Sequence, residues 1–262
     1  MNNDLSLKKL FVLDMDGTIY LDSTPIPGAI EFVEFCKSHG IRIIYFTNNA
    51  SKNIRMYYEK LRRIGFPVDD GDIYSSADVT IDFLKREHPG QSVYLVGTPA
   101  LEESFVSAGI ELTDGSRADI VVSSFDTTLT YEKLDNACRL IRNGAIFYST
   151  HPDFNCPTKD GFIPDSGSIC ACITASTGVL PRYFGKPYYE TADYLARMAG
   201  VNFDSAAVVG DRLYTDIALG KKHGITSILV LTGESTIDDV NDENRPDHIM
   251  QSIGCIIPEL CK

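Results

Sequence analysis

The chain has 262 residues, of which 44% are hydrophobic and 23% are charged, an ordinary balance for a globular protein with a sizeable core. Its formal net charge is −12 at pH 7. A chain this acidic repels nucleic acid and anionic lipid, so we expect neither nucleic acid nor a membrane as a partner. A phosphorylated substrate would also be repelled unless cations are placed locally.

The cysteine pattern and the hydropathy of the chain indicate the cellular compartment in which we expect the protein. The seven cysteines include no Cys-x-x-Cys pair, and their odd number favours free thiols. No apolar run has the length of a membrane span, and the N-terminal residues show no signal-peptide pattern. We therefore predict a cytoplasmic protein without a zinc site.

Strand-like and helix-like patterns alternate along the chain. Residues 8–14 predict a buried strand, 27–40 a helix that ends in glycine, 41–47 a second strand, and 52–65 an amphipathic helix. Further strands are predicted at residues 92–97, 118–124, 145–150, 205–210 and 226–231. The alternation predicts α/β architecture with a parallel sheet. Because these strands are many for one small sheet, a second α/β unit embedded in the first would explain them.

Polar residues gather in four places where a predicted strand or turn ends. They are Asp14-Met15-Asp16-Gly17-Thr18, Thr47-Asn48-Asn49, Lys186 within YFGKPYYE, and GDRLYTDI at residues 210–217. Parallel strands bring their carboxyl ends to one edge of a sheet, where open α/β proteins bind ligands. We therefore expect the four groups to meet.

If they meet, four carboxylates share one site: Asp14, Asp16, Asp211 and Asp216. Like charges in a shared site are costly unless a cation is bound or a proton is shared. Mg²⁺ suits such oxygen ligands and often binds substrate phosphate as well. Lys186 would add positive charge, and backbone amides at the start of the next helix would donate to phosphate oxygens.

These residues have the chemistry that hydrolysis of a phosphomonoester needs. Asp14 can attack phosphorus and form an aspartyl-phosphate. Asp16, two residues on, can protonate the leaving oxygen and later activate water. Gly17 permits the sharp turn that follows them.

In their order, the motifs DMDGT, TNN, GKP and GDRLYTDI resemble those of the haloacid dehalogenase (HAD) superfamily of phosphohydrolases. The opening DMDGTIYLDSTPIPGA is similar to that of its NagD-like branch, and the resemblance runs from about Leu10 to Leu231. It implies a Rossmann-like doubly wound parallel-sheet core with an inserted α/β cap domain. We place the catalytic core at residues 1–75 and 184–262 and the cap at 76–183.

The resemblance implies a role for each matching acid. Asp14 resembles the nucleophile and a magnesium ligand. Asp16 resembles the general acid/base, with its backbone carbonyl also on the metal. Asp211 resembles the metal-binding acid. Asp216 resembles the second acid of that motif, which either lies in the outer sphere of the metal or orients Lys186.

The phosphate-binding residues follow from the same resemblance. Thr47 and Asn48, with Asn49 beside them, resemble the phosphate-binding group, and Lys186 resembles the lysine that neutralises phosphate and nucleophile. Within the predicted cap, residues 149–169 resemble the loop that faces the substrate. Its polar members are His151, Asp153 and Asn155, of which His151 and Asp153 are the candidate substrate contacts.

The sequence thus predicts a Mg²⁺-dependent phosphatase for a small phosphorylated metabolite, such as a sugar phosphate or a nucleotide monophosphate. A phosphomutase or phosphotransferase on the same scaffold is an alternative, and so is a non-catalytic HAD-like binding protein. A dehalogenase is disfavoured because it needs no acid at Asp16. The oligomeric state stays open, a homo-oligomer included.

Overall fold

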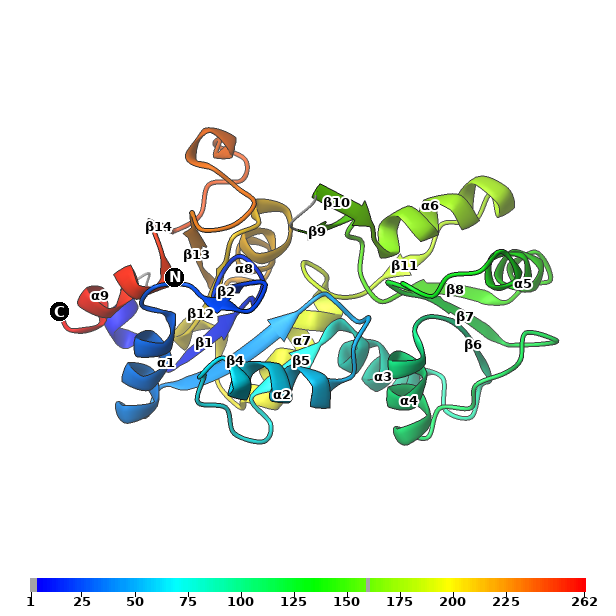
Figure 1. Ribbon diagram of the computed structural model, residues 1–262, viewed down its shortest axis with the longest axis horizontal. Helices are drawn as coiled ribbons and strands as arrows, with labels where there is room; N and C mark the ends of the chain where they lie inside the picture. The colour runs from blue at the N-terminus through cyan, green and yellow to red at the C-terminus, as the bar shows by residue number, and fades with distance from the viewer. Residues whose placement is uncertain (1–3, 159–160) are drawn as a thin grey trace. The chain divides into compact units, whose positions relative to one another are not determined.

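The computed structural model describes residues 4–158 and 161–262 (Figure 1). The chain folds into two compact units. The first contains the residues up to Thr47, Arg55–Tyr74 and Lys186–Lys262, and the second contains Asn48–Ile54 and Ser75–Gly185. None of the helices in the described ranges is long and apolar enough to cross a membrane.

The first unit is built on a six-stranded sheet (Figure 1). Its strands are β1 (Leu10–Leu13), β4 (Arg42–Thr47), β5 (Ile73–Ser75), β12 (Ala206–Gly210), β13 (Thr226–Val230) and β14 (His248–Met250). Every residue of β1, β12 and β13 is buried. Such continuous burial is typical of parallel strands covered on both faces. A short antiparallel pair, β2 (Tyr20–Leu21) and β3 (Thr24–Pro25), follows β1.

The strand order explains where a ligand can bind. In space the order is β14-β13-β12-β1-β4-β5, and β1 lies parallel to both β4 and β12. The chain runs from β1 through β4 to β5 and then returns to β12 on the other side of β1. The order therefore reverses between β1 and β12, and this is where doubly wound folds form their ligand crevice. The predicted doubly wound α/β fold is confirmed.

Helices connect the strands of the first unit. They are α1 (Ala29–Ser38), α2 (Ile54–Arg63), α7 (Tyr189–Ala199), α8 (Ala218–His223) and α9 (Ile257–Leu260), with the 3₁₀ turns η1 (Leu5–Leu7), η2 (Phe203–Ser205), η4 (Ile237–Asp239) and η5 (Ile253–Ile256) and the π turn η3 (Leu213–Ile217). The helices predicted at 27–40 and 52–65 correspond to α1 and α2. In α1 the buried stripe contains Phe32, Val33 and Cys36, and this face packs against the sheet.

The second unit has a parallel sheet of its own and an antiparallel hairpin. Its sheet has the order β11-β8-β7-β6 and the hairpin pairs β9 with β10, where the strands are β6 (Val93–Val96), β7 (Ile120–Ser123), β8 (Ile146–Ser149), β9 (Asn155–Thr158), β10 (Gly161–Pro164) and β11 (Arg182–Tyr183). Its helices are α3 (Ser76–Glu87), α4 (Pro99–Ser107), α5 (Tyr131–Arg142) and α6 (Ser166–Thr177). Val121, Phe147 and Ile173 belong to the buried cluster between sheet and helices.

The division between the units differs from the predicted core at one segment. Residues 48–54, which we assigned to the core, group with the second unit. The Ser76 hydroxyl donates to the carbonyl of Asn48 at 2.6 Å, and the Thr98 hydroxyl donates to the carbonyl of Ser51 at 2.8 Å. These bonds attach the segment after β4 to the starts of α3 and α4. The rest of the second unit spans residues 75–185, whereas the predicted cap spans residues 76–183.

Candidate functional site

A buried lysine joins two carboxylates in the first unit. Asp14 follows β1 directly, and Lys186 Nζ lies 2.5 Å from its Oδ1. The same ammonium lies 2.7 Å from Oδ1 of Asp216 and donates to the carbonyl of Phe46 at 3.1 Å. The Lys186 side chain is 2% exposed. Burial alone would lower its pKa, but Asp14 and Asp216 raise it above the ordinary value, so the amine stays charged.

The carboxylate of Asp211 follows β12 and is enclosed by backbone. The Thr18 hydroxyl donates to Oδ1 at 3.3 Å, and the backbone amide of Glu234 donates to Oδ2 at 2.7 Å. A Cβ atom at Gly17 would lie 2.5 Å from Oδ2, and one at Gly233 would lie 2.0 Å from it. Only glycine allows the chain to approach this carboxylate so closely.

Asp216 lies on the π turn η3, a helix form that is frequent at functional sites. Its Oδ2 accepts from the backbone amide of Arg212 at 3.3 Å and from the Thr215 hydroxyl at 3.2 Å. A Cβ at Gly210 would lie 2.1 Å from its Cγ. The other oxygen is thereby directed to Lys186, which is one of the two roles that we left open for this acid.

Three of the four predicted carboxylates come together. One oxygen each of Asp14, Asp211 and Asp216 lies within 4.8 Å of the others. Burial raises the pKa of Asp14 to about 8, an effect that Lys186 opposes and the two other acids reinforce. Burial and Asp216 raise the pKa of Asp211 to about 6. An all-oxygen donor set with excess negative charge fits a hard divalent cation, so these residues fit the predicted metal.

Asp16 is set apart from that group. Its side chain is 46% exposed, with Oδ1 3.8 Å from Lys60 Nζ. Its Oδ2 accepts from the Tyr20 hydroxyl at 3.3 Å. The predicted crowding of four acids is therefore seen for Asp14, Asp211 and Asp216, of which the last two are buried and Asp14 is partly buried. The metal contact predicted for Asp16 concerns its backbone carbonyl and stays a prediction.

The predicted phosphate-binding residues after β4 are divided between the units. Thr47 ends β4 and is buried in the first unit. In the second unit, the Asn48 amide donates to the Asp153 carboxylate at 3.3 and 3.4 Å, and Asn49 Oδ1 accepts from the amide of Ser51 at 3.0 Å. The next helix begins at Ile54, close to its predicted start at residue 52.

The polar members of the predicted substrate loop lie in the second unit, and two of them are buried. His151 has no exposed surface: its Nε2 lies 2.8 Å from Asp165 Oδ1 and its Nδ1 lies 2.9 Å from the Thr150 hydroxyl. Asp153 is 3% exposed, whereas Asn155 begins the exposed hairpin strand β9. His151 thus has internal partners on both ring nitrogens, and a substrate contact from it stays a prediction.

Family comparisons agree with the motif order. Residues 11–111 match the model of the haloacid dehalogenase-like hydrolases, and residues 183–255 match a second HAD-hydrolase-like model. The acid sugar phosphatase of Staphylococcus aureus (strain MRSA252) is 37% identical over 238 residues, which cover 91% of this chain and 92% of that protein. The chain belongs to the HAD-like hydrolase family.

Solved structures indicate the branch of the family to which the chain belongs. The 4-nitrophenylphosphatase from Thermotoga maritima has a TM-score of 0.94 and 43% identity, with 98% of each chain covered. NagD from E. coli K-12 has a TM-score of 0.87 and 31% identity, with 94% of this chain and 97% of that chain covered. The predicted place in the NagD-like branch of the HAD phosphatases is confirmed.

Some neighbours of the HAD acids were not found from the sequence. They include the start of the loop after β13, where the Thr232 hydroxyl donates to the carbonyl of Gly17 at 2.6 Å. The strand-end rule that selected the other motifs applies equally to β13 and would have found Thr232, Gly233 and Glu234.

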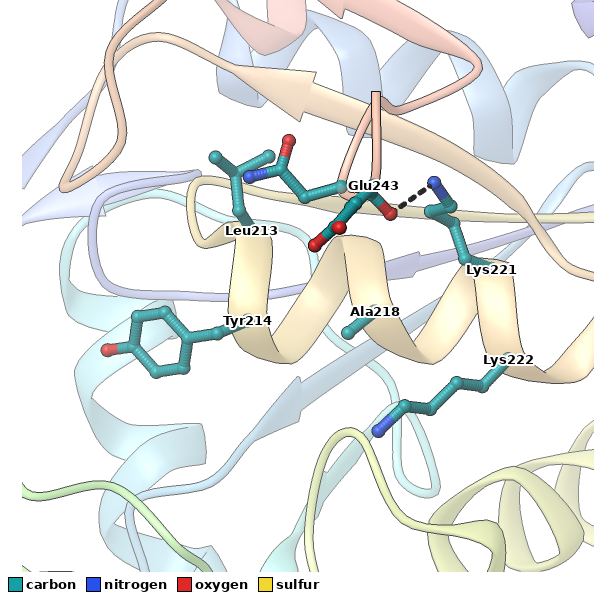
Figure 2. A pocket seen from close by; sticks show the side chains of 7 residues that line it. Leu213, Tyr214, Ala218, Lys221, Lys222 and Glu243 are labelled. Carbon is teal, nitrogen blue, oxygen red and sulfur yellow. Dashed lines mark hydrogen bonds between the residues drawn. The ribbon is translucent and has the colours of Figure 1, made fainter. Parts of the chain in front are cut away.

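A separate hollow of about 480 Å³ lies in the first unit, beside η3 and α8 (Figure 2). Tyr214 and Lys222 line it from the helical side, and Glu243 and Asn244 from the neighbouring loop. Lys221 Nζ donates to the carbonyl of Glu243 at 2.8 Å, the bond drawn in Figure 2. Asp14, Lys186, Asp211 and Asp216 are not among the residues that line this hollow.

Proposed function

We propose that this HAD protein hydrolyses a small phosphomonoester through an aspartyl-phosphate on Asp14, with Mg²⁺ as cofactor. The observation that carries the proposal is the Asp14 carboxylate, paired with the buried Lys186 beside Asp211 and Asp216. The names of the relatives, acid sugar phosphatase and 4-nitrophenylphosphatase, support the same reaction class. A sugar phosphate is the substrate class that the first of these names favours.

The acids at the ends of β1 and β12 would hold the metal. Asp14 and Asp211 would provide carboxylate oxygens and Asp16 its backbone carbonyl, while Asp216 holds Lys186. Bound there, Mg²⁺ would neutralise the phosphoryl oxygens and the excess charge of the acids. Lys186 supplies fixed positive charge from the protein itself, so an acidic chain can accept a phosphate dianion.

The reaction has two steps. In the first, an oxygen of Asp14 attacks phosphorus, the bond from phosphorus to the leaving oxygen breaks, and Asp16 gives that oxygen a proton. In the second, water attacks phosphorus, Asp16 accepts a proton from the water, and the bond from phosphorus to Asp14 breaks. Inorganic phosphate leaves and both acids return to their first state. Thr47, with Asn48 and Asn49, would donate hydrogen bonds to the phosphoryl oxygens.

We propose that the second unit is a cap domain that excludes bulk water and selects substrates by their leaving group. Most of it is inserted between Tyr74 and Lys186, so the chain returns to the first unit at the lysine of the site itself. His151 and Asp153 remain candidate contacts within it. A cytoplasmic location is likewise proposed from the free thiols, all seven of which lie in the described residues without a disulfide.

The test is phosphate release from a panel of 4-nitrophenyl phosphate, sugar phosphates and nucleoside monophosphates, with Mg²⁺ and with chelator. Asp14→Asn is the blank, because an amide is a poor nucleophile, and circular dichroism checks its fold. We expect Mg²⁺-dependent release by the wild type alone. Isomerisation of a sugar phosphate without release would favour the phosphomutase alternative. Release no greater than that of the blank would favour the non-catalytic one.

A further inference from the structure

Asp16 has two partners to which the reaction above gives no role. We propose that Lys60 and Tyr20 are positioning residues, which hold the Asp16 carboxylate in the orientation from which it protonates the leaving oxygen. This inference rests on the proposed function and adds two residues to it. All three side chains belong to the first unit.

The two oxygens of Asp16 are held separately. Tyr20, in β2, donates its hydroxyl to Oδ2 at 3.3 Å, while Lys60, on α2, places Nζ 3.8 Å from Oδ1. Tyr20 and Lys60 are far apart in the sequence and belong to different elements, β2 and α2. A carboxylate that has a different partner on each oxygen loses freedom of rotation about its last bond, which a single partner would not remove.

Lys60 and Tyr20 also fix each other. The Lys60 Nζ lies 3.6 Å from the centroid of the Tyr20 ring, within the range of a cation–π interaction. The ring has no exposed surface, and the backbone amide of Gly17 donates to the Tyr20 carbonyl at 2.9 Å. The tyrosine is therefore a rigid platform, and the lysine rests on it while facing Asp16.

Lys60 differs from an ordinary surface partner. On the same helix, Arg55 and Glu59 form an ion pair at 3.8 Å with side chains 78% and 69% exposed, and such pairs contribute little. The Lys60 side chain is 15% exposed, so water screens its charge less. The comparison favours a specific electrostatic role for Lys60 over a solvated helix face.

Positioning matters for this acid because it is 46% exposed. A half-exposed aspartate in water changes rotamer readily, whereas proton transfer needs the carboxyl within hydrogen-bond reach of the leaving oxygen. Misplacement by a fraction of the side-chain length removes that reach. The Lys60–Tyr20 stack supplies the restraint that burial supplies for the other acids.

The experiment compares two aryl esters that differ only in a 4-nitro group, phenyl phosphate and 4-nitrophenyl phosphate. Phenolate needs protonation as it leaves, whereas nitrophenolate leaves without it. We expect Lys60→Met to lower kcat/KM about tenfold for phenyl phosphate and no more than about twofold for the nitro ester. The parameter kcat/KM reports the first step, and the ratio of the two values does not depend on the fraction of folded enzyme.

Three further variants sharpen the result. Lys60→Arg should keep the ratio of kcat/KM for phenyl phosphate to that for 4-nitrophenyl phosphate close to the wild-type value, because a guanidinium keeps the charge and stacks on the ring. Tyr20→Phe should lower the ratio less than Lys60→Met does, since it keeps the platform. Arg55→Met removes a charge from the same helix and should leave the ratio unchanged.

If Lys60→Met left the ratio of kcat/KM for phenyl phosphate to that for 4-nitrophenyl phosphate unchanged, even with both esters slowed, the positioning role would be overturned. The phosphatase proposal would still stand. If the wild type released phosphate from neither ester nor from any member of the panel, the proposed function would fail, and this inference with it. A ratio that Lys60→Met lowers and Lys60→Arg restores supports the inference.

Discussion

Lys186 Nζ lies 2.5 Å from Oδ1 of Asp14, although 172 positions separate the two residues in the sequence. The ammonium is shared with Asp216, and Asp211 lies close by. One lysine therefore pairs with two carboxylates of a group of three. The excess negative charge makes the metal-free site electrostatically unfavourable, and it links the stability of the protein to both pH and divalent cations.

The first prediction concerns the pH dependence of stability without metal. Burial raises the pKa of Asp14 from 3.8 to about 8 in the folded state, which therefore binds the proton more tightly than the unfolded chain does. The stabilisation is present below the unfolded pKa and is lost as pH rises through the folded value, between about 4 and 8. Asp211, with a pKa of about 6, adds to the lower part of this window.

Thermal unfolding in chelator measures the effect. Asp14→Asn should melt at a higher temperature than the wild type at about pH 8, and the difference should shrink towards about pH 5. Mg²⁺ should raise the Tm of the wild type more at the higher pH, because the acids are then ionised and bind it. A wild type that is the more stable of the two in chelator at about pH 8 would contradict the charge imbalance.

The second prediction concerns removal of the buried ammonium. Lys186→Met leaves Asp14 and Asp216 without their shared cation, so we expect the free energy of unfolding in chelator to fall by about 3 to 5 kcal/mol. Urea unfolding at about pH 8 measures it. Lys37→Met is the matched control: Lys37 also joins two acids, but it is 25% exposed and should cost about 1 kcal/mol or less. Equal losses in the two variants would argue against a special role for burial.

The third prediction tests the close approach of backbone to Asp211. Gly233 has no positive φ, so Gly233→Ala adds bulk without backbone strain, and its Cβ would lie 2.0 Å from Asp211 Oδ2. The carboxylate must move, and we expect the Mg²⁺ concentration for half-maximal stabilisation to rise about tenfold or more. Calorimetric titration with Mg²⁺ measures the corresponding rise in the dissociation constant without any substrate. An unchanged affinity would mean that Asp211 tolerates displacement or does not bind the metal.

Residues next to strand ends were predictable, because the parallel sheet itself brings them together. Asp14 and Asp211 follow neighbouring strands β1 and β12, so a rule about sheet edges was enough to pair them. Lys186 was selected by its place at a predicted turn, and the motif resemblance added its role, since no periodicity distinguishes it from a surface lysine. The α/β alternation likewise gave the fold class, but it could not show that residues 48–54 would bond to α3 and α4.

Partners that depend on packing between elements were not predictable. Lys60 lies in a strongly amphipathic helix, and its polar face is as compatible with water as with Asp16. His151 was predicted as a candidate substrate contact, and the sequence did not indicate that its side chain is fully buried. Its burial follows from the position of Asp165 at the start of α6, fourteen residues away in the sequence, which single-sequence patterns do not show.

The last prediction separates two roles for His151. The ring bonds Asp165, whose carboxylate also accepts from the amide of Ser166 at the start of α6, so the histidine ties the end of β8 to that helix. We expect His151→Ala to lower the free energy of unfolding by about 2 kcal/mol, since it leaves a cavity and removes a buried hydrogen bond. His39→Ala, at the exposed end of α1, is the control and should cost less. Relative kcat/KM values across the phosphate panel should stay as in the wild type. If selectivity changes while stability does not, His151 contacts substrate, as the sequence alone suggested.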